Sequence, residues 1–444
     1  MSTGDLAAGH RAVPPDYDRA AAWTLTLLLS ACLTLAYIDR AVINLLAQSI
    51  KTDLNISDTR LALLQGLAFT VSFTLATVPG GWLADRFDRR RLIALGVVAW
   101  SVMTGLCGLA QNFEMLFLAR VGVGLFEAVL TPCALAMIAA ALPVGPRATA
   151  MSVYHMGTVL GVGLSLILGG LLLEWLGSPA APVIMGLGNF APWQQTFLLL
   201  ALPGFVLAAV VLFFAREPRR AVEARPADAP RGLAPFMKTH GAVFMAVTAA
   251  MTLMLSAVAG ATAWAPIFLV RDWGLSPGEI ARTYGPISVV FGLVGTFFGG
   301  WLASRLARSG RGDASLRATL FAAVGATLFG VLVYQTDRGA LGWSALAAIT
   351  FFAPMPFGVA FAMLADLTPP EIRGRITAIY VFVLNAVGHT LGPLMVGLTN
   401  DTLFKSEAAL GWSLALLWAV CGGAAIVILS LATRGYRRAA GGEA

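Results

Sequence analysis

The sequence predicts an all-α integral membrane protein with twelve transmembrane helices arranged as two pseudo-symmetric six-helix bundles. Three observations support this fold class: the composition, the recurrence of long apolar segments, and an internal repeat. Of the 444 residues, 58% are hydrophobic and only 12% are charged, which is about half the charged share of an ordinary soluble domain. A chain of this composition is expected in lipid rather than in water.

Apolar segments recur along the whole chain, and each is long enough to cross a hydrocarbon core about 30 Å thick. We predict spans over residues 22–49, 59–84, 91–110, 113–141, 148–176, 193–215, 240–270, 278–303, 316–335, 340–365, 374–400 and 411–433. The longest polar stretch, Arg216 to Lys238, contains six basic residues and four prolines and is predicted to be a linker. The expected organisation is an N-terminal bundle over 1–215, a cytoplasmic linker over 216–238 and a C-terminal bundle over 239–444.

An internal repeat supports the division into halves. The segment Gly80-Gly-Trp-Leu-Ala-Asp-Arg86 recurs as Gly299-Gly-Trp-Leu-Ala-Ser-Arg305, with six identities in seven positions. A second, shorter repeat pairs Arg147 and Tyr154, at the start of the fifth span, with Arg373 and Tyr380, at the start of the eleventh. Both matches join equivalent helices of the two halves.

The basic residues predict the orientation. If the amino terminus is cytoplasmic, 22 of the 30 Lys and Arg fall on the cytoplasmic side, as the positive-inside rule requires. A net charge of +7 therefore indicates topology and not a nucleic-acid partner. The four cysteines lie in apolar segments at unrelated spacings, which predicts neither disulfides nor a metal site. We find no nucleotide-binding loop and no nucleophile–base constellation, so an enzyme is not expected.

The repeated loop carries a motif, Gly81-x-Leu-Ala-Asp85-Arg86-x-x-Arg89-Arg90. A glycine lets two helices approach closely, and Asp85 could cap a helix end or pair with an arginine across the cytoplasmic seam between the halves. A contact made in only one conformation would favour that conformation. The arginines could instead serve only as topology determinants. This motif resembles the loop signature of the major facilitator superfamily, and the repeated six helices resemble its architecture. The second copy keeps Arg305 but has Ser304 in place of Asp85.

Four charged residues lie deep inside predicted spans, away from the span ends, where each costs several kcal/mol unless it is paired or hydrated. Asp39 and Arg40 lie in the first helix, and Arg120 and Glu127 lie in the fourth. Arg120 and Glu127 are separated by about 10 Å along their helix and are not expected to pair with each other. Asp39 and Arg120 lie at similar depths and could meet. A carboxylate that alternates between a desolvated site and an arginine partner can load and release a proton. A static ion pair that fixes helix packing is the alternative.

Residues of the first five helices resemble one particular branch of this superfamily. Tyr37-Ile-Asp39-Arg40, the segment from Leu54 to Gly66, and Arg120 with Glu127-Ala128 resemble the spinster branch, particularly its bacterial members. That resemblance implies proton-linked movement of lysophospholipids or sphingosine-1-phosphate. It also implies that Asp39 and Glu127 are protonatable acids and that Arg40 and Arg120 line the cavity.

Further residues are expected to line the cavity or to close its inner end. Amphipathic side chains suited to a lipid-like ligand are Tyr37, Tyr154, Trp264, Tyr380, Asn385 and His389, although each could equally be a packing residue. Asp366 could pair with Arg373 or Arg375 as a cytoplasmic contact in the second half.

The expected function is therefore proton-coupled secondary transport of an anionic, lipid-like substrate by alternating access. The expected partners are this substrate, protons and membrane lipids; no cofactor beyond the proton gradient is expected, and one chain is expected to suffice. The expected location is a bacterial inner membrane with both termini cytoplasmic. A carrier of drugs or small organic anions and a receptor that does not translocate its ligand are the alternatives.

Overall fold

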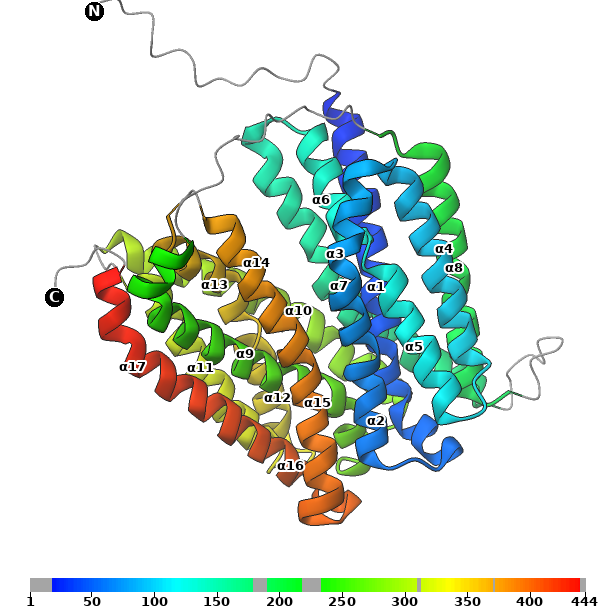
Figure 1. Cartoon of the computed structure of the whole chain (residues 1–444). Helices are drawn as coiled ribbons and strands as arrows, with labels where there is room; N and C mark the ends of the chain where they lie inside the picture. The colour runs from blue at the N-terminus through cyan, green and yellow to red at the C-terminus, as the bar shows by residue number, and fades with distance from the viewer. Residues whose placement is uncertain (1–17, 179–189, 218–232, 310–312, 370–371, 440–444) are drawn as a thin grey trace, which may run out of the picture.

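The computed structural model describes residues 18–178, 190–217, 233–309, 313–369 and 372–439. Every regular element in these ranges is a helix, and twelve helices are long and apolar enough to cross a membrane. This confirms the predicted fold class of a multi-pass, all-α membrane protein. Figure 1 shows the helices as two bundles, α1–α8 and α9–α17, which we call the N-terminal and C-terminal bundles.

Several spans are interrupted helices, so the number of elements exceeds the number of spans. The N-terminal bundle contains α1 (Arg19–Leu54), α2 (Asp58–Gln65), α3 (Leu67–Arg86), α4 (Arg89–Gly108), α5 (Phe113–Glu127), α6 (Leu130–Ala141), α7 (Val144–Leu176) and α8 (Pro192–Phe214). The C-terminal bundle contains α9 (Leu233–Arg271), α10 (Pro277–Arg308), α11 (Ala314–Val333), α12 (Ala340–Phe352), α13 (Met355–Leu367), α14 (Arg373–Val383), η1 (Leu384–Gly388), α15 (His389–Leu398), η2 (Thr399–Phe404), η3 (Glu407–Ala409), α16 (Leu410–Leu417), η4 (Trp418–Gly422) and α17 (Gly423–Ala439). Because α9 begins at Leu233, the last residues of the predicted linker are helical, whereas 218–232 lie outside the described residues.

Polar side chains at the helix starts explain where several spans begin. The side chains of Asp18, Ser57, Asp88 and Asn112 accept hydrogen bonds from the first-turn amides of α1, α2, α4 and α5. Ser276 caps α10 together with Glu279 in a capping box. These bonds satisfy amide groups that have no partner within their own helix.

The internal repeat is visible in the packing of both halves. Arg86 lies over the ring of Trp82 at 4.1 Å, and Arg305 lies over Trp301 at 5.4 Å. A Cβ on Gly80 would meet the Ala128 carbonyl at 3.3 Å, whereas Gly81 has open space beside it. The equivalent pair in the second half, Gly299 and Gly300, shows the same difference: a Cβ on Gly299 would meet a neighbouring helix, whereas Gly300 has open space beside it. Of the glycines predicted to permit close helix contact, Gly80 therefore does so, whereas Gly81 does not face a neighbouring helix.

The second predicted repeat, which pairs Arg147 with Arg373, also corresponds to equivalent contacts in the two bundles. Arg147 donates to the carbonyl of Leu142 at 3.1 Å, and Arg373 donates to the carbonyl of Thr368 at 3.2 Å. Each arginine thereby binds the end of the preceding helix. The two arginines occupy equivalent positions in the two bundles.

Helix α1 begins and helix α17 ends on one side of the molecule, which we call the termini side, and the bundles diverge toward it (Figure 1). They converge on the opposite side, where α2 packs on α15 and α7 packs on α10. A Cβ on Gly66 of α2 would meet the carbonyl of His389 in α15 at 2.9 Å. Hydrogen bonds and ion pairs that join described residues of the two bundles lie toward this opposite side.

Candidate functional site

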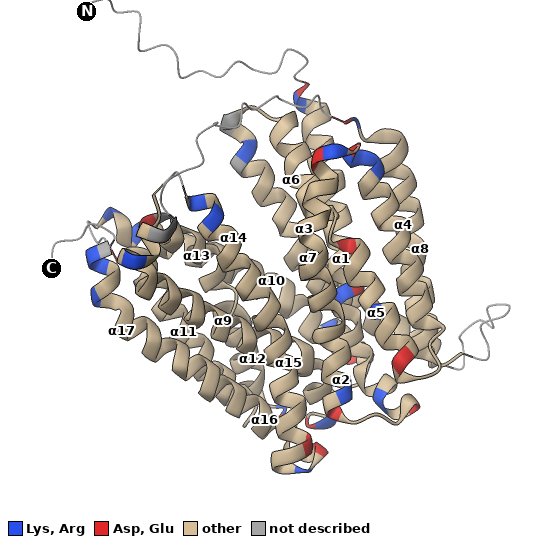
Figure 2. Ribbon diagram, in the orientation of Figure 1, with Lys and Arg blue, Asp and Glu red and all other residues tan. Residues whose placement is uncertain are grey.

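An ion pair joins the first and fourth spans in the interior of the N-terminal bundle. A guanidinium nitrogen of Arg40, on α1, donates a hydrogen bond to Oε1 of Glu127, at the end of α5. The Glu127 side chain is 2% exposed, while that of Arg40 is 19% exposed. Figure 2 shows charged residues midway along this bundle, away from both ends of the molecule. Arg40 is therefore the member of the pair that a molecule between the bundles could reach.

Aromatic rings surround the Arg40 guanidinium. Its central carbon lies 4.4 Å from the ring centre of Tyr37, 4.2 Å from that of Phe69 and 4.8 Å from that of Phe73. Ring faces attract a cation, most strongly where water is excluded. The rings stabilise the charge of Arg40 and fix its orientation toward Glu127.

The carboxyl group of Asp39 lies in a different environment from that of Glu127. Asp39 is 1% exposed, and neither of its oxygens has a hydrogen-bond partner among the described residues. The Trp100 indole N–H and the Thr104 hydroxyl of α4 are likewise buried without a hydrogen-bond partner among the described residues. A buried, ionised carboxylate requires such partners.

The side chain of Arg120 links α5 to α1 through hydrogen bonds. It is 1% exposed and donates to the backbone carbonyl of Asp39 at 3.1 Å and to that of Arg40 at 3.2 Å. Asp39 and Arg120 thus meet, as expected from their depths, but through a main-chain oxygen and not through the carboxylate. The guanidinium is enclosed, so the predicted role of Arg120 as a substrate-binding residue is not supported in this conformation.

The predicted cavity walls fall into two groups. Tyr37, Asn385 and His389 are partly exposed, and His389 lies within electrostatic reach of Arg40 from the C-terminal bundle. The other three aromatic residues do not line the space between the bundles: Tyr154, Trp264 and Tyr380 are each no more than 1% exposed. Tyr154 is bonded to the Thr131 hydroxyl and Trp264 to the Pro393 carbonyl. Such large rings pack between helices, where they bury the most apolar surface.

The residues predicted to act at the termini side have described contacts within their own bundle. Arg89 donates to the carbonyl of Ala84 at 3.0 Å, and the amide of Arg90 donates to Glu217 at 3.0 Å. Asp85 lies at the exposed end of α3. Its predicted contact across the seam stays a prediction.

The contacts of Asp366 differ from the predicted pairing. Its carboxylate accepts hydrogen bonds from the hydroxyls of Ser315 at 3.1 Å and Tyr436 at 2.8 Å. These partners come from α11 and α17, so Asp366 ties three helices of the C-terminal bundle together. Arg373 donates to the Thr368 carbonyl instead, as in the first half.

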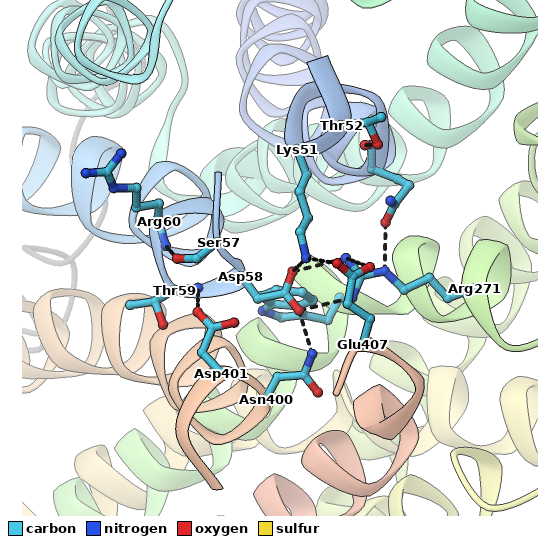
Figure 3. A network of polar contacts seen from close by, with 12 residues as sticks. Lys51, Thr52, Ser57, Asp58, Thr59, Arg60, Arg271, Asn400, Asp401 and Glu407 are labelled. Carbon is cyan, nitrogen blue, oxygen red and sulfur yellow. Dashed lines mark hydrogen bonds and ion pairs between the residues drawn. The ribbon is translucent and has the colours of Figure 1, made fainter. Parts of the chain in front are cut away.

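A second charged group was not singled out from the sequence as a site. It lies on the side opposite the termini and consists of Lys51, Asp58, Arg271, Asn400 and Glu407, which we call the Asp58 cluster (Figure 3). Its members lie close to helix ends, where a charged residue resembles an ordinary loop charge. The full burial of Asp58, a carboxylate at the start of a span, could not be read from the sequence.

Comparisons with known proteins bear on the whole chain. The sequence model of the Major Facilitator Superfamily matches residues 29–393. The chain is 30% identical over 424 residues to an MFS-type efflux pump of Mycolicibacterium smegmatis, covering 94% of each chain. It is 25% identical over 411 residues to protein spinster homolog 1 of Xenopus tropicalis, covering 87% of this chain and 74% of that protein.

A solved structure shares the fold over nearly the whole chain. It is the crystal structure of a bacterial homolog to the human lysosomal transporter spinster, in an inward-facing and unoccupied conformation. The two superpose with a TM-score of 0.75 at 24% identity, covering 95% of this chain and 98% of the other. The similarity therefore extends across both bundles.

Proposed function

Since this chain belongs to the Major Facilitator Superfamily, we propose that it is a proton-coupled secondary transporter that moves an anionic, lipid-like substrate by alternating access. The observation that carries this proposal is the Arg40–Glu127 ion pair, which lies inside an aromatic enclosure with only its arginine accessible. A charge placed within a membrane span is costly and marks a functional site by default.

The pair can couple the binding of a proton to the binding of an anion. Protonation of Glu127 would remove its negative charge and weaken its hold on Arg40. The guanidinium, already oriented by its rings, would then bind a phosphate or carboxylate of the substrate in a charge-assisted hydrogen bond. Release of the anion would restore the ion pair and return the proton. Apolar side chains between the bundles would contact the substrate's hydrocarbon part.

Asp39 offers a second place for a proton. Its carboxyl is buried without a hydrogen-bond partner among the described residues, a situation that favours the uncharged form. Arg120 holds the main chain of Asp39 and Arg40 in place. In this proposal, Asp39 and Glu127 carry protons, Arg40 binds the substrate and Arg120 is a positioning residue.

The distribution of basic residues supports an orientation. Figure 2 shows Lys and Arg gathered on the termini side, while on the opposite side they are interleaved with Asp and Glu. By the positive-inside rule the termini side faces the cytoplasm, and we place the protein in a bacterial inner membrane. The divergence of the bundles toward the termini then corresponds to the state open to the cytoplasm.

The test is transport by the protein reconstituted in liposomes with an imposed pH gradient. Asp39→Asn and Glu127→Gln should each lose gradient-driven movement of a lysophospholipid while retaining exchange of labelled for unlabelled substrate. Asp53→Asn is a matched control, because Asp53 accepts a hydrogen bond from Trp193 at the edge of the same bundle. Full gradient-driven uptake by both variants, alongside a normal control, would show that neither acid couples protons to transport.

A drug or a small organic anion is the second candidate substrate, and the similarity to an efflux pump favours it. Such a molecule would use the same Arg40 for its anionic group or the same rings for its apolar part. Competition in the exchange assay separates the two: a lysophospholipid, but not a small hydrophilic carboxylate, should displace the labelled lipid. Binding without any exchange would indicate a receptor instead.

A further inference from the structure

One carboxylate on the side opposite the termini binds donors from both bundles (Figure 3). Asp58, whose side chain is fully enclosed, accepts hydrogen bonds from Lys51 at 2.6 Å, from two nitrogens of Arg271 at 3.0 Å each, and from the Asn400 amide at 2.5 Å. The Arg271 bonds form a bidentate fork, which is the strongest geometry for an arginine and a carboxylate. Breaking the contacts of Asp58 with Arg271 and Asn400, which belong to the other bundle, would be required for this side to open.

The members of the Asp58 cluster divide between the bundles. Lys51 and Asp58 belong to α1 and α2 in the N-terminal bundle, whereas Arg271, Asn400 and Glu407 belong to α9, η2 and η3 in the C-terminal bundle. Glu407 is 60% exposed and lies 2.7 Å from the Lys51 nitrogen and 3.6 Å from a nitrogen of Arg271. Each bundle therefore contributes one cation and one carboxylate.

We propose that the Asp58 cluster is an ionic gate that closes this side of the transporter and separates, on opening, into two neutral pairs. Lys51–Asp58 leaves with the N-terminal bundle, and Arg271–Glu407 leaves with the C-terminal bundle. Removing one partner from a buried ion pair is strongly destabilising because the other charge is left uncompensated. A gate that separates into neutral pairs avoids that cost, so it can be strong when closed and still reversible.

Arg271 is the main connection across the gate. Besides Asp58, it donates through Nε to the side chain of Gln48 on α1 at 2.7 Å. Two neighbouring contacts close the same seam: the amide of Thr59 donates to Asp401 at 2.7 Å, and Gly397 lies against the carbonyl of Asp58. Lys51, by contrast, binds Asp58 within its own bundle, and its one contact across the gate among the described residues is with the exposed carboxylate of Glu407 at 2.7 Å.

The two cations are therefore expected to act in opposite directions, although both bind the same carboxylate. Arg271→Gln removes the bonds that cross the gate and favours the open state. Lys51→Gln removes the contact with Glu407, which contributes little because Glu407 is 60% exposed. It leaves the buried Asp58 satisfied by Arg271 and Asn400 when closed but deprives it of its partner when open, so it favours the closed state. A merely structural role for the cluster would shift both variants in the same direction.

The experiment measures distances between spin labels at Thr52→Cys and Thr402→Cys, two exposed positions on opposite sides of the gate. The four native cysteines are buried, so the labels should attach at the introduced sites. An Asn400→Ala background weakens the gate and should populate both states, so that shifts in either direction are visible. The measurement needs neither substrate nor a pH gradient, and its outcome is independent of the proposed proton coupling.

Arg271→Gln should raise the ratio of long-distance to short-distance populations by roughly tenfold or more, and Lys51→Gln should lower it by about threefold. Asp58→Asn, which preserves the side-chain shape, should shift the ratio in the same direction as Arg271→Gln and serves if that variant does not fold. Asp53→Asn should leave the ratio unchanged. Equal shifts for the two cation variants, or unchanged distances in both Arg271→Gln and Asp58→Asn, would overturn the proposal.

Discussion

Arg120 provides a sharp test of whether a buried arginine supports the helix or binds the substrate. Its two terminal nitrogens donate to the carbonyls of Asp39 and Arg40, and its side chain is enclosed. We predict that Arg120→Lys lowers stability while leaving the affinity for an anionic substrate unchanged. A lysine ammonium lacks the planar fork of a guanidinium and would reach only one of the two carbonyls.

The size of the effect follows from the bond that is lost. A hydrogen bond to a charged group contributes about 1.5–3 kcal/mol, and Arg120→Lys removes one such bond from a buried site. For a chain of 444 residues, that loss corresponds to a fall of roughly 2–3 °C in melting temperature. Thermal unfolding of the detergent-solubilised protein, followed by tryptophan fluorescence, measures the shift, and displacement of a labelled lysophospholipid measures the affinity.

Arg40→Lys is the matched comparison. Arg40 is partly exposed, binds Glu127 and lies over three rings, so this variant should weaken substrate binding by about tenfold, because a lysine cannot reproduce the planar contact with rings and oxyanion. If Arg120→Lys instead weakened binding as much as Arg40→Lys and left the melting temperature unchanged, the assignment of Arg120 as a positioning residue would be refuted.

Three further outcomes are expected. Phe69→Leu should weaken substrate exchange, because it removes a ring face 4.2 Å from the Arg40 guanidinium, a contact of about 0.5–2 kcal/mol; near-normal exchange kinetics would contradict this. Gly80→Val should cost about 1–3 kcal/mol by overpacking against the backbone of Ala128 and Val129 between α5 and α6, whereas Gly81→Val, which faces open space, should not change the melting temperature. Burial opposes ionisation of Asp313, but hydrogen bonds from two arginines outweigh it and lower its pKa. Its stabilisation is thus present above the unfolded pKa and lost as pH falls through the folded value, so Asp313→Asn should lower the melting temperature by about 1–2 °C at pH 7 and should have no effect once the folded protein also carries a proton on Asp313.

The fold was predictable because two of its determinants can be read directly along the sequence. Hydropathy locates each span, and the repeat of Gly80–Arg86 at Gly299–Arg305 relates the halves without any knowledge of contacts. The breaks within spans were not predictable in the same way. The π-helical turn at Leu384–Gly388 depends on how its helix packs between α3 and α9, and no local sequence signal required it.

The interior charges were predictable as a set, but their pairing was not. Counting residues from a helix end gives depth, which placed Asp39 and Arg120 at one level, yet it gives no rotation about the helix axis. That rotation directs Arg40, and not Asp39, toward Glu127. The same limit explains why Tyr154 and Trp264 were expected to line the cavity, although both are fully buried.

Helix α1 connects the two charged groups. Arg40, which binds Glu127, and Lys51, which binds Asp58, lie on the same uninterrupted helix, separated along its axis by about 16 Å at 1.5 Å per residue. A continuous helix transmits displacement along its length, so a change in the Arg40–Glu127 pair that tilts α1 also moves Lys51 and Gln48 against Arg271. The Arg40–Glu127 pair and the gate therefore both act on the same helix, α1. Binding at Arg40 could shift the equilibrium between the open and closed gate through movement of that helix.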